Sequence, residues 1–529
     1  MANILTNNVI LTDGPIKGVE RDTAGILAFK GIPFAAPPVG PLRWKSPRQP
    51  APWKEVLDAT KFGPTPWSAL LGAPTPTPQS EDCLTVNVWT AAERDEKLPV
   101  MVWIYGGGFQ FGSSATPDYD GSKLAEKGVV CVSFNYRLGP LGFLALPELD
   151  NEEHPSGNFG LQDQIAALRW VRNNIAAFGG DPDNITLFGE SAGGHAVGLL
   201  MASPLSTGLF HKAILQSGAF WDTEHGPLPN FERARELGSM LTKKLGVSSI
   251  SELRNLSAEV VTSAGSWNHN EDPVVTALGP SVDGYVLEQY PSQVFLQGRQ
   301  MKIPMITGWN AVEDLFFRPR ALPYSSPDAY KSAAERLFGS RTPEFLSLYP
   351  GETVEQAKAS AEQLIGDMVI SQQTWEAADL HFHHGITPVY VYHFTYTSAY
   401  SPLPAHGADL AFVFGTLRKN QIVSTAPPAG DEDKAFADRM ITYWTNFAKF
   451  SDPNSPNPTL PHWPAYRGSS TDVLDLGNVI APLDYPQARF RFIQSMRKDG
   501  VLPTDWVHNH LTSSDNRTNA LNLTGAQDD

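Results

Sequence analysis

The feature that most constrains this chain is one sharp turn between a strand-like and a helix-like segment. Residues 185–188 are rich in β-branched and aromatic side chains, and residues 189–193 read Gly-Glu-Ser-Ala-Gly. A helix-compatible apolar run, residues 196–201, follows. Glycines two positions before and after a serine leave space for the strained backbone of a nucleophile elbow. A helix N-terminus at the serine favours negative charge. The pattern therefore predicts that Ser191 is a nucleophile.

Apolar runs alternate with helical patterns over much of the chain. The runs lie at residues 100–105, 129–134, 185–188, 213–215, 303–306 and 389–392. Runs that are apolar on both faces are typical of buried parallel strands. Residues 159–178 carry apolar side chains at helical spacing, and we expect Asp181 and Pro182 to close this segment before the next strand. The order predicts an α/β fold with a large, mostly parallel, twisted central sheet and helices on both faces.

Composition narrows the partners and the location. Of the 529 residues 41% are hydrophobic and 18% charged, which is typical of a globular protein with a sizeable core. The net charge of −16 argues against nucleic acid or an anionic membrane as a partner. No apolar run reaches the roughly 18 residues that a membrane span needs. No signal peptide is visible, so we expect a cytoplasmic protein without a membrane anchor, or a secreted one if a signal has been removed. The oligomeric state stays open.

Three consecutive glycines follow the apolar run at residues 100–105. Glycine lets the backbone approach a ligand closely and point its N–H groups toward it. Residues 106–108 are therefore expected to help form an oxyanion hole. We expect its donors to be the amides of Gly107, Gly108 and Ala192.

Several long motifs, in one order, resemble the type-B carboxylesterase and cholinesterase family of the α/β-hydrolase superfamily. Residues 29–38 read Phe-Lys-Gly-Ile-Pro-Phe-Ala-Ala-Pro-Pro, and further motifs lie at residues 81–88, 135–137, 157–164, 215–218 and 463–466. The resemblance covers nearly the whole chain. It implies an α/β-hydrolase domain over residues 1–510, and we expect residues 511–529 to be a flexible tail. It also implies a serine hydrolase that cleaves small-molecule carboxylic esters through an acyl-enzyme on Ser191.

The resemblance also supplies the other two members of a catalytic triad. Glu313 matches the family's acid in a Gly-x-x-x-x-Glu setting, with Asp314 as the adjacent rival. His406 matches its histidine in the sequence His-Gly-Ala-Asp-Leu. The order Ser, Glu, His is that of α/β-hydrolases. We expect His406 to act as the base and Glu313 to orient it, with no cofactor and no metal. The histidines at 381, 383 and 384 are interpreted as a helix end.

Other residues have less definite roles. Glu190 and Ser217 resemble family positions near the triad, where they could tune the site or only pack. His195 stands where a small residue is expected, and core packing is an alternative. Glu190 could also line a substrate pocket, together with five aromatic residues that could instead belong to the core: Phe109, Phe111, Trp221, Phe316 and Phe317.

The chain departs from the family pattern in two places. No cysteine precedes Cys83, so the family's usual bridge is absent, and we expect Cys83 and Cys131 to be free thiols. The proline-rich loop at residues 63–80 is short for a cholinesterase. Trp67 is the only candidate there for a choline-binding tryptophan, so choline esters are doubtful substrates.

The resemblance further implies two structural ion pairs, Arg43 with Glu81 and Arg137 with Asp163. Two other functions remain open. The same triad could transfer the acyl group to an alcohol or amine, or form a lactone. A non-catalytic, cholinesterase-like binding protein is more remote, because Ser191, Glu313 and His406 are all present.

Overall fold

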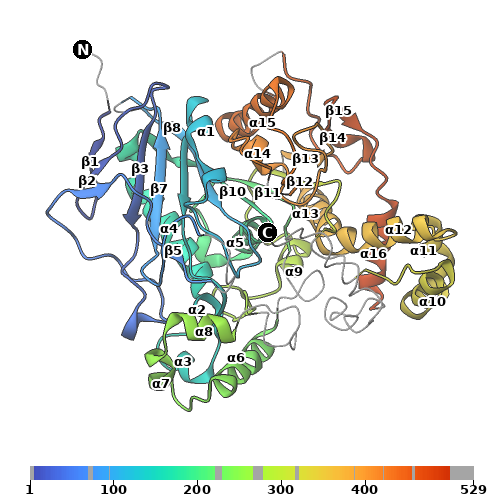
Figure 1. Cartoon of the computed structure of the whole chain (residues 1–529), viewed down its shortest axis with the longest axis horizontal. Coiled ribbons are helices and arrows are strands. Elements are labelled where there is room, and N and C mark those ends of the chain that lie inside the picture. The colour runs from blue at the N-terminus through green and yellow to red at the C-terminus, as the bar shows by residue number, and fades with distance from the viewer. Residues whose placement is uncertain are drawn as a thin grey trace.

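A central ten-stranded sheet organises the molecule. The computed structural model describes residues 5–68, 75–93, 96–220, 229–265, 278–315, 321–386, 388–420, 422–454 and 459–500. Across the sheet the strand order is β15-β14-β13-β12-β11-β10-β8-β9-β7-β3 (Figure 1). The strands are β3 (Leu27–Pro33), β7 (Thr85–Thr90), β8 (Leu98–Ile104), β9 (Val130–Phe134), β10 (Gly180–Glu190), β11 (Lys212–Gln216), β12 (Met305–Asn310), β13 (Val389–Phe394), β14 (Val473–Leu476) and β15 (Ala481–Leu483).

The middle of this sheet is parallel and its edges are antiparallel. Pairing is parallel from β9 through β8, β10, β11, β12 and β13 to β14. Strand β15 at one end, and β7 and β3 at the other, pair antiparallel. Each predicted apolar run overlaps one of these strands, which confirms the predicted mostly parallel sheet. One boundary was wrong. Asp181 and Pro182 lie inside β10, in its irregular part before Ile185, because the strand begins directly after the preceding helical turn.

Two small sheets flank the N-terminal edge. One contains β1 (Asn8–Ile10), β2 (Pro15–Gly18) and β4 (Leu57–Ala59). The other pairs β5 (Thr65–Pro66) with β6 (Gln79–Ser80) in parallel, so the two ends of the proline-rich loop lie together. Residues 69–74 of that loop are outside the described part of the chain.

Helices cover both faces of the sheet. Helices α4, α5, α9 and α13 form one layer through mutual and strand contacts, and α1, α14 and α15 form the other. The helices are α1 (Ser122–Glu126), α2 (Gly139–Phe143), α3 (Pro147–Asp150), α4 (Phe159–Asn174), α5 (Ala192–Ala202), α6 (Phe231–Leu245), α7 (Ile250–Asn255), α8 (Ala258–Ala264), α9 (Pro291–Leu296), α10 (Pro327–Phe338), α11 (Thr342–Leu348), α12 (Val354–Gly366), α13 (Gln372–His383), α14 (Leu410–Val413), α15 (Asp431–Phe450) and α16 (Ala488–Lys498). Within the described residues, no helix is long and apolar enough to cross a membrane.

Short segments of other helix types join these elements. A π-helical turn, η7 (Asp367–Ser371), connects α12 to α13. The 3₁₀ turns are η1 (Gly40–Leu42), η2 (Pro117–Tyr119), η3 (Ile175–Phe178), η4 (Pro204–Ser206), η6 (Gly339–Arg341) and η8 (Ser470–Asp472). Gly366, next to η7, packs closely on the segment after β12 that carries Glu313, because a Cβ on Gly366 would lie 3.4 Å from the Cβ of Glu313.

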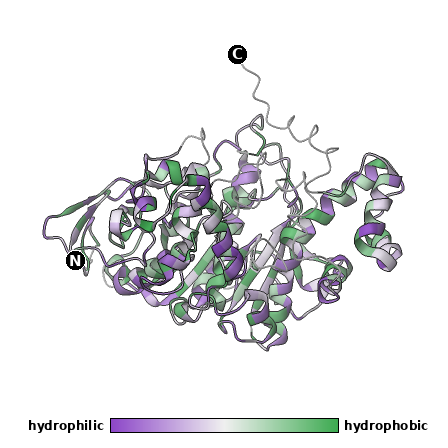
Figure 2. Ribbon diagram, turned by 90° about the horizontal axis from the view of Figure 1, so that it is seen from below, coloured by the Kyte–Doolittle hydropathy of each residue, from purple (hydrophilic) through white to green (hydrophobic). Residues whose placement is uncertain are grey.

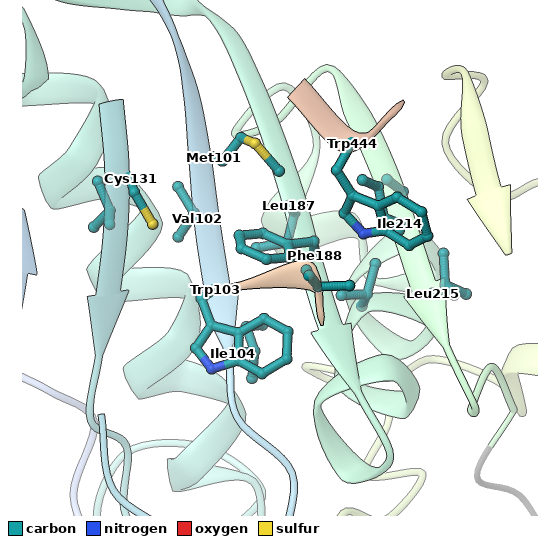
Figure 3. Close-up of a cluster of buried hydrophobic side chains, with 14 of the residues drawn as sticks. Met101, Val102, Trp103, Ile104, Cys131, Leu187, Phe188, Ile214, Leu215 and Trp444 are labelled. Carbon is teal, nitrogen blue, oxygen red and sulfur yellow. The ribbon is translucent and has the colours of Figure 1, made fainter. Parts of the chain in front are cut away.

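The core follows the middle strands. Met101, Trp103, Leu187, Phe188 and Ile214 are fully buried and pack between the sheet and its helices (Figure 3). Figure 2 shows hydrophobic residues concentrated in the central strands and polar ones spread over the outer helices. A separate apolar cluster lies among α10, α11, α12 and α16, at one end of the molecule (Figure 1). This division leaves the single-domain assignment for residues 1–510 a prediction, and residues 511–529 lie outside the described part.

Both predicted ion pairs are confirmed. The Arg43 guanidinium contacts the Glu81 carboxylate through Nε at 2.6 Å and Nη2 at 2.5 Å. Arg137 donates from Nε to Asp163 at 2.8 Å and from Nη2 at 2.7 Å, and its backbone N–H reaches the same carboxylate at 3.0 Å. The Arg137 and Asp163 side chains are 4% and 0% exposed, so this pair is a buried one.

The two cysteines are also as predicted. Cys83 and Cys131 are free and buried, and Cys131 lies in β9 opposite Trp89 of β7. Burial raises the pKa of both thiols far above the ordinary value. Each thiol therefore stays protonated and packs as a small apolar group.

Candidate active site

The predicted elbow stands at the carboxyl end of β10. Ser191 follows the last strand residue, directly precedes α5, and has φ 55° and ψ −125°. Such a backbone conformation is strained for a non-glycine residue. The two flanking glycines are sterically required. A Cβ on Gly193 would overlap the carbonyl oxygen of Ile104, and one on Gly189 would lie 2.5 Å from the Gly193 carbonyl carbon. The serine side chain is therefore lifted off the sheet edge at the first turn of a helix.

The glycine loop after β8 lies against this elbow. A Cβ on Gly106 would approach the Cβ of Ser191 to 3.0 Å. Gly107 and Gly108 have φ of 107° and 61°, which glycine adopts without strain. Among the hydrogen bonds of the described residues, neither amide is a donor. Ala192 is the first residue of α5, so its N–H has no partner within the helix. These three amides are suited to bind an oxyanion.

Glu313 and His406 meet although 93 positions separate them in sequence. His406 Nδ1 lies 2.5 Å from Glu313 Oε2. The other oxygen, Oε1, accepts hydrogen bonds from Ser217 Oγ and from the Asn310 backbone N–H, each at 2.6 Å. In the neutral imidazole the single ring proton belongs on Nδ1, because Nδ1 has the closer carboxylate, and Nε2 is then the acceptor. This is the arrangement that a general base requires.

Two loops carry this pair and are joined by backbone hydrogen bonds. Val312 N–H donates to Pro404 O at 3.0 Å, and His406 N–H donates to Val312 O at 2.9 Å. This pairing turns Glu313 toward His406. Asp314, the rival acid, is also buried, but the carboxylate in contact with His406 Nδ1 is that of Glu313.

Acidic groups dominate the electrostatics around the imidazole. Glu190 Oε1 lies 3.4 Å from His406 Nε2. Burial, and then repulsion from Asp409 and Glu313, raise the pKa of Glu190 to about 8, against the attraction of His406. Burial disfavours an imidazolium, but the charges of Glu313 and Glu190 outweigh it and raise the pKa of His406 to about 9. A positive charge that forms on His406 is thus stabilised.

The predicted pocket residues are only partly described. Phe109 is fully buried in the glycine loop, has φ 61°, and packs edge-on against Phe143 at 5.6 Å. Phe111 is 36% exposed. Trp221, Phe316 and Phe317 lie outside the described residues.

The next residues are the other histidines considered in the sequence analysis, and Trp67. His195 is fully buried within α5. His381 and His383 are in the last turn of α13, which confirms the interpretation as a helix end. Within the described part of the chain, no group of three or more metal-ligating side chains is present. Trp67 packs beside the cluster that contains Leu141 and Trp44.

Sequence reasoning missed three buried polar residues near the Glu313–His406 pair: Asn310, Asp409 and Gln216. Asp409 accepts hydrogen bonds from Gln216 Nε2 at 2.7 Å and Asn310 Nδ2 at 3.2 Å. Asn310 and Asp409 both stand inside the motifs that identified Glu313 and His406. The signal was thus available, but nothing in the sequence pairs the two motifs.

The fold and site together define a class: an α/β-hydrolase with a serine elbow, a glycine loop and a buried Glu–His pair at the carboxyl edge of the sheet. Comparison with known proteins agrees. The sequence profile of the carboxylesterase family matches residues 5–490. Two solved structures, a PNB esterase and a thermophilic PNB esterase, superpose with TM-scores of 0.76 and 0.77. Each is 34% identical and covers 92% of this chain and 99% of its own.

Curated relatives carry esterase names. Fumonisin B1 esterase of Sphingopyxis macrogoltabida is 38% identical over 86% of this chain and 83% of its own. Para-nitrobenzyl esterase of Bacillus subtilis is 36% identical over 92% of this chain and 98% of its own. Pyrethroid hydrolase Ces2e of Rattus norvegicus is 34% identical over 85% of this chain and 83% of its own. This chain belongs to the carboxylesterase family and is a carboxylic ester hydrolase.

Proposed function

We propose that Ser191, His406 and Glu313 form the catalytic triad of this ester hydrolase, with the amides of Gly107, Gly108 and Ala192 as its oxyanion hole. The observation that carries this assignment is the 2.5 Å contact between His406 Nδ1 and Glu313 Oε2. The strained elbow beside the glycine loop supports it.

The geometry supports a two-step reaction. Ser191 Oγ attacks the ester carbonyl carbon while its proton passes to His406 Nε2. The carbonyl oxygen becomes an oxyanion held by the three amides, and Glu313 stabilises the imidazolium. His406 then protonates the departing alcohol, which leaves an acyl-enzyme. Water, deprotonated by His406, attacks that ester, and the carboxylic acid and free Ser191 are released.

The direct test is Ser191→Ala, assayed with a p-nitrophenyl short-acyl ester. Activity should fall at least about a thousandfold, because removing a triad member costs on the order of 10⁴-fold or more. Ser206→Ala is the control, since Ser206 is a buried serine whose hydroxyl donates to the carbonyls of Leu200 and Ser203. An active Ser191→Ala enzyme, or organophosphate labelling of another serine, would disprove the assignment.

We further propose neutral or mildly hydrophobic esters of modest size as substrates, rather than choline esters or long-chain triglycerides. Phe109 and Phe111 flank the glycine loop, where burial of acyl carbons contributes roughly 0.8 kcal/mol per CH₂. Trp67 packs against the apolar cluster around Leu141, which does not favour a cage for quaternary ammonium groups. The relatives' names, which include fumonisin B1, para-nitrobenzyl and pyrethroid substrates, indicate a family that accepts varied esters.

The substrate proposal is tested by kcat/KM over matched acetyl, butyryl, octanoyl and choline esters. We expect kcat/KM to be higher for the butyryl ester than for the choline ester. A preference for choline, or activation by emulsified long-chain lipid, would contradict the proposal. A competing alcohol added to the same assay distinguishes hydrolysis from acyl transfer, because transfer would yield a new ester in place of the acid.

The free thiols of Cys83 and Cys131 support a cytoplasmic location, because reducing compartments keep cysteines unpaired. Subcellular fractionation tests this proposal, and recovery of the protein in the medium would contradict it.

A further inference from the structure

We propose that Asn310 is a positioning residue that fixes His406 in register with Glu313 through one side-chain amide. The proposal rests on the proposed triad and adds the group that holds its two halves together. Asn310 is the last residue of β12, is 1% exposed, and lies three positions before Glu313.

The amide of Asn310 contacts both sides of the His406 loop. Its Nδ2 donates to Ala405 O at 2.7 Å, the carbonyl directly before His406. The same nitrogen donates to Asp409 Oδ1 at 3.2 Å, three residues after His406. Its backbone N–H donates to Glu313 Oε1 at 2.6 Å. Asn310 therefore contacts Glu313 and also binds the His406 loop on both sides of His406.

The far side of this contact is itself fixed. Asp409 is fully buried, and its Oδ2 accepts from Gln216 Nε2 at 2.7 Å and from Tyr392 OH at 3.3 Å. Gln216 Oε1 in turn accepts from Trp444 Nε1 at 3.1 Å. Gln216, Tyr392 and Trp444 all lie in core strands or a core helix. The network therefore ties the His406 loop, through Asp409, to the central sheet.

Only a side chain that donates can make both bonds. An aspartate at position 310 has the same shape but would face a carbonyl oxygen and a carboxylate with acceptors alone. An alanine would leave the Ala405 carbonyl and Asp409 Oδ1 without this donor. Neither change removes the backbone N–H that holds Glu313, so the side-chain role can be tested separately.

The side chain also acts on the charge around His406. The ionisable groups that face His406 are Glu313, Glu190 and Asp409, and the Tyr392 phenol faces Asp409. Burial raises the pKa of Asp409, and the amides of Asn310 and Gln216 oppose that rise. Without the Asn310 donor, Asp409 becomes more easily protonated, and its upward pull on the pKa of His406 weakens.

The experiment compares Asn310→Ala and Asn310→Asp with the wild type, using p-nitrophenyl butyrate over a pH series. In Asn310→Ala we expect kcat to fall about 10–100-fold, as for other residues that orient a catalytic ligand, with KM changed less than about threefold. The acid limb of kcat/KM, where His406 loses its proton, should move to lower pH. In Asn310→Asp an added negative charge should move that limb to higher pH.

Asn446→Ala is the matched control. Asn446 is a buried asparagine whose Nδ2 donates to the Pro453 carbonyl at 3.1 Å, and α15 carries it. It should lose stability like Asn310→Ala but keep the wild-type kcat and acid limb. An Asn310→Ala enzyme that behaves like this control would overturn the proposal.

Asp409→Asn decides the question if the Asn310 variants do not fold, as judged by thermal melting. It keeps the shape of the side chain, removes the charge that Asn310 contacts, and should move the acid limb to lower pH. An unshifted limb would overturn the proposal. Failure of the triad itself is distinguishable, since an active Ser191→Ala enzyme contradicts the triad whatever the Asn310 variants do.

Discussion

The elbow at Ser191 and the buried Glu313–His406 pair, which we propose as the nucleophile side and the acid–base side of the site, are built on different physical principles. At the elbow, Ser191 is held by backbone strain and by glycines that leave no space for a Cβ. On the other side, Glu313 and His406 stand on loops far apart in sequence and are held by buried hydrogen bonds. The first region depends on excluded volume, and the second on charge and on directed donors. A substitution at the elbow and a substitution at the Glu313–His406 pair should therefore have different effects on the kinetics and the pH profile.

The largest effect is expected on the acid–base side. Glu313→Gln should lower kcat about 10⁴-fold, because the neutral amide neither holds the correct imidazole tautomer nor stabilises the imidazolium. Asp314→Asn, one position on, should change kcat little. Steady-state kinetics of the two variants checks this, and a sensitive Asp314 with a tolerant Glu313 would reverse the assignment.

A second prediction concerns the ion pair beneath the glycine loop. Arg137 joins Asp163, and the segment after it donates from Gly139 N–H to Phe109 O at 2.8 Å. Arg137→Met should destabilise the protein by about 3–5 kcal/mol, because it leaves the buried Asp163 without its partner. Lys434→Met breaks an exposed pair with Asp431 and should cost less than about 1 kcal/mol. Urea unfolding measures both, and equal losses would refute the distinction.

The steric side is tested at the elbow itself. Gly193→Ala would drive a methyl group into the Ile104 carbonyl and displace Ser191, and we expect at least about a 100-fold loss of kcat/KM. Gly430→Ala is the control, because the nearest atom to its Cβ, Asp433 Oδ2, is 3.6 Å away. The acid limb of the pH profile should stay in place in Gly193→Ala, unlike in the Asn310 variants. A shifted limb would mean that the two regions are not separable.

The smallest effect should come from the cysteines. Cys131 lies in β9 of the sheet that both regions share, and Cys83 lies in the segment just before β7. Native protein should resist iodoacetamide at Cys83 and Cys131, since burial keeps both thiols protonated and inaccessible. The native enzyme should keep its activity after this treatment. After unfolding without reductant, mass spectrometry should find two alkylated thiols. One disulfide, or rapid labelling of the native enzyme, would contradict this.

Much of the fold was predictable because its signals are local. Each apolar run became a strand, since a segment buried on both faces must be apolar throughout. The boundary at Asp181 and Pro182 was not predictable, because the irregular start of β10 is set by pairing with β8 rather than by propensity. The pocket aromatics were equally ambiguous. Phe109 is fully buried and Phe111 partly exposed, although they are two positions apart.

By itself the sequence determined the elbow at Ser191, the glycine loop and the absence of a possible bridge before Cys83, because each depends on residue identity over a few positions. The tertiary structure alone decided that Glu313 rather than Asp314 contacts His406, and that Asn310 and Asp409 connect their loops. The physical reason is range. Strain and glycine spacing act between neighbours, whereas a hydrogen bond between residues 93 positions apart exists only once β12 and β13 have paired and brought their loops to one edge.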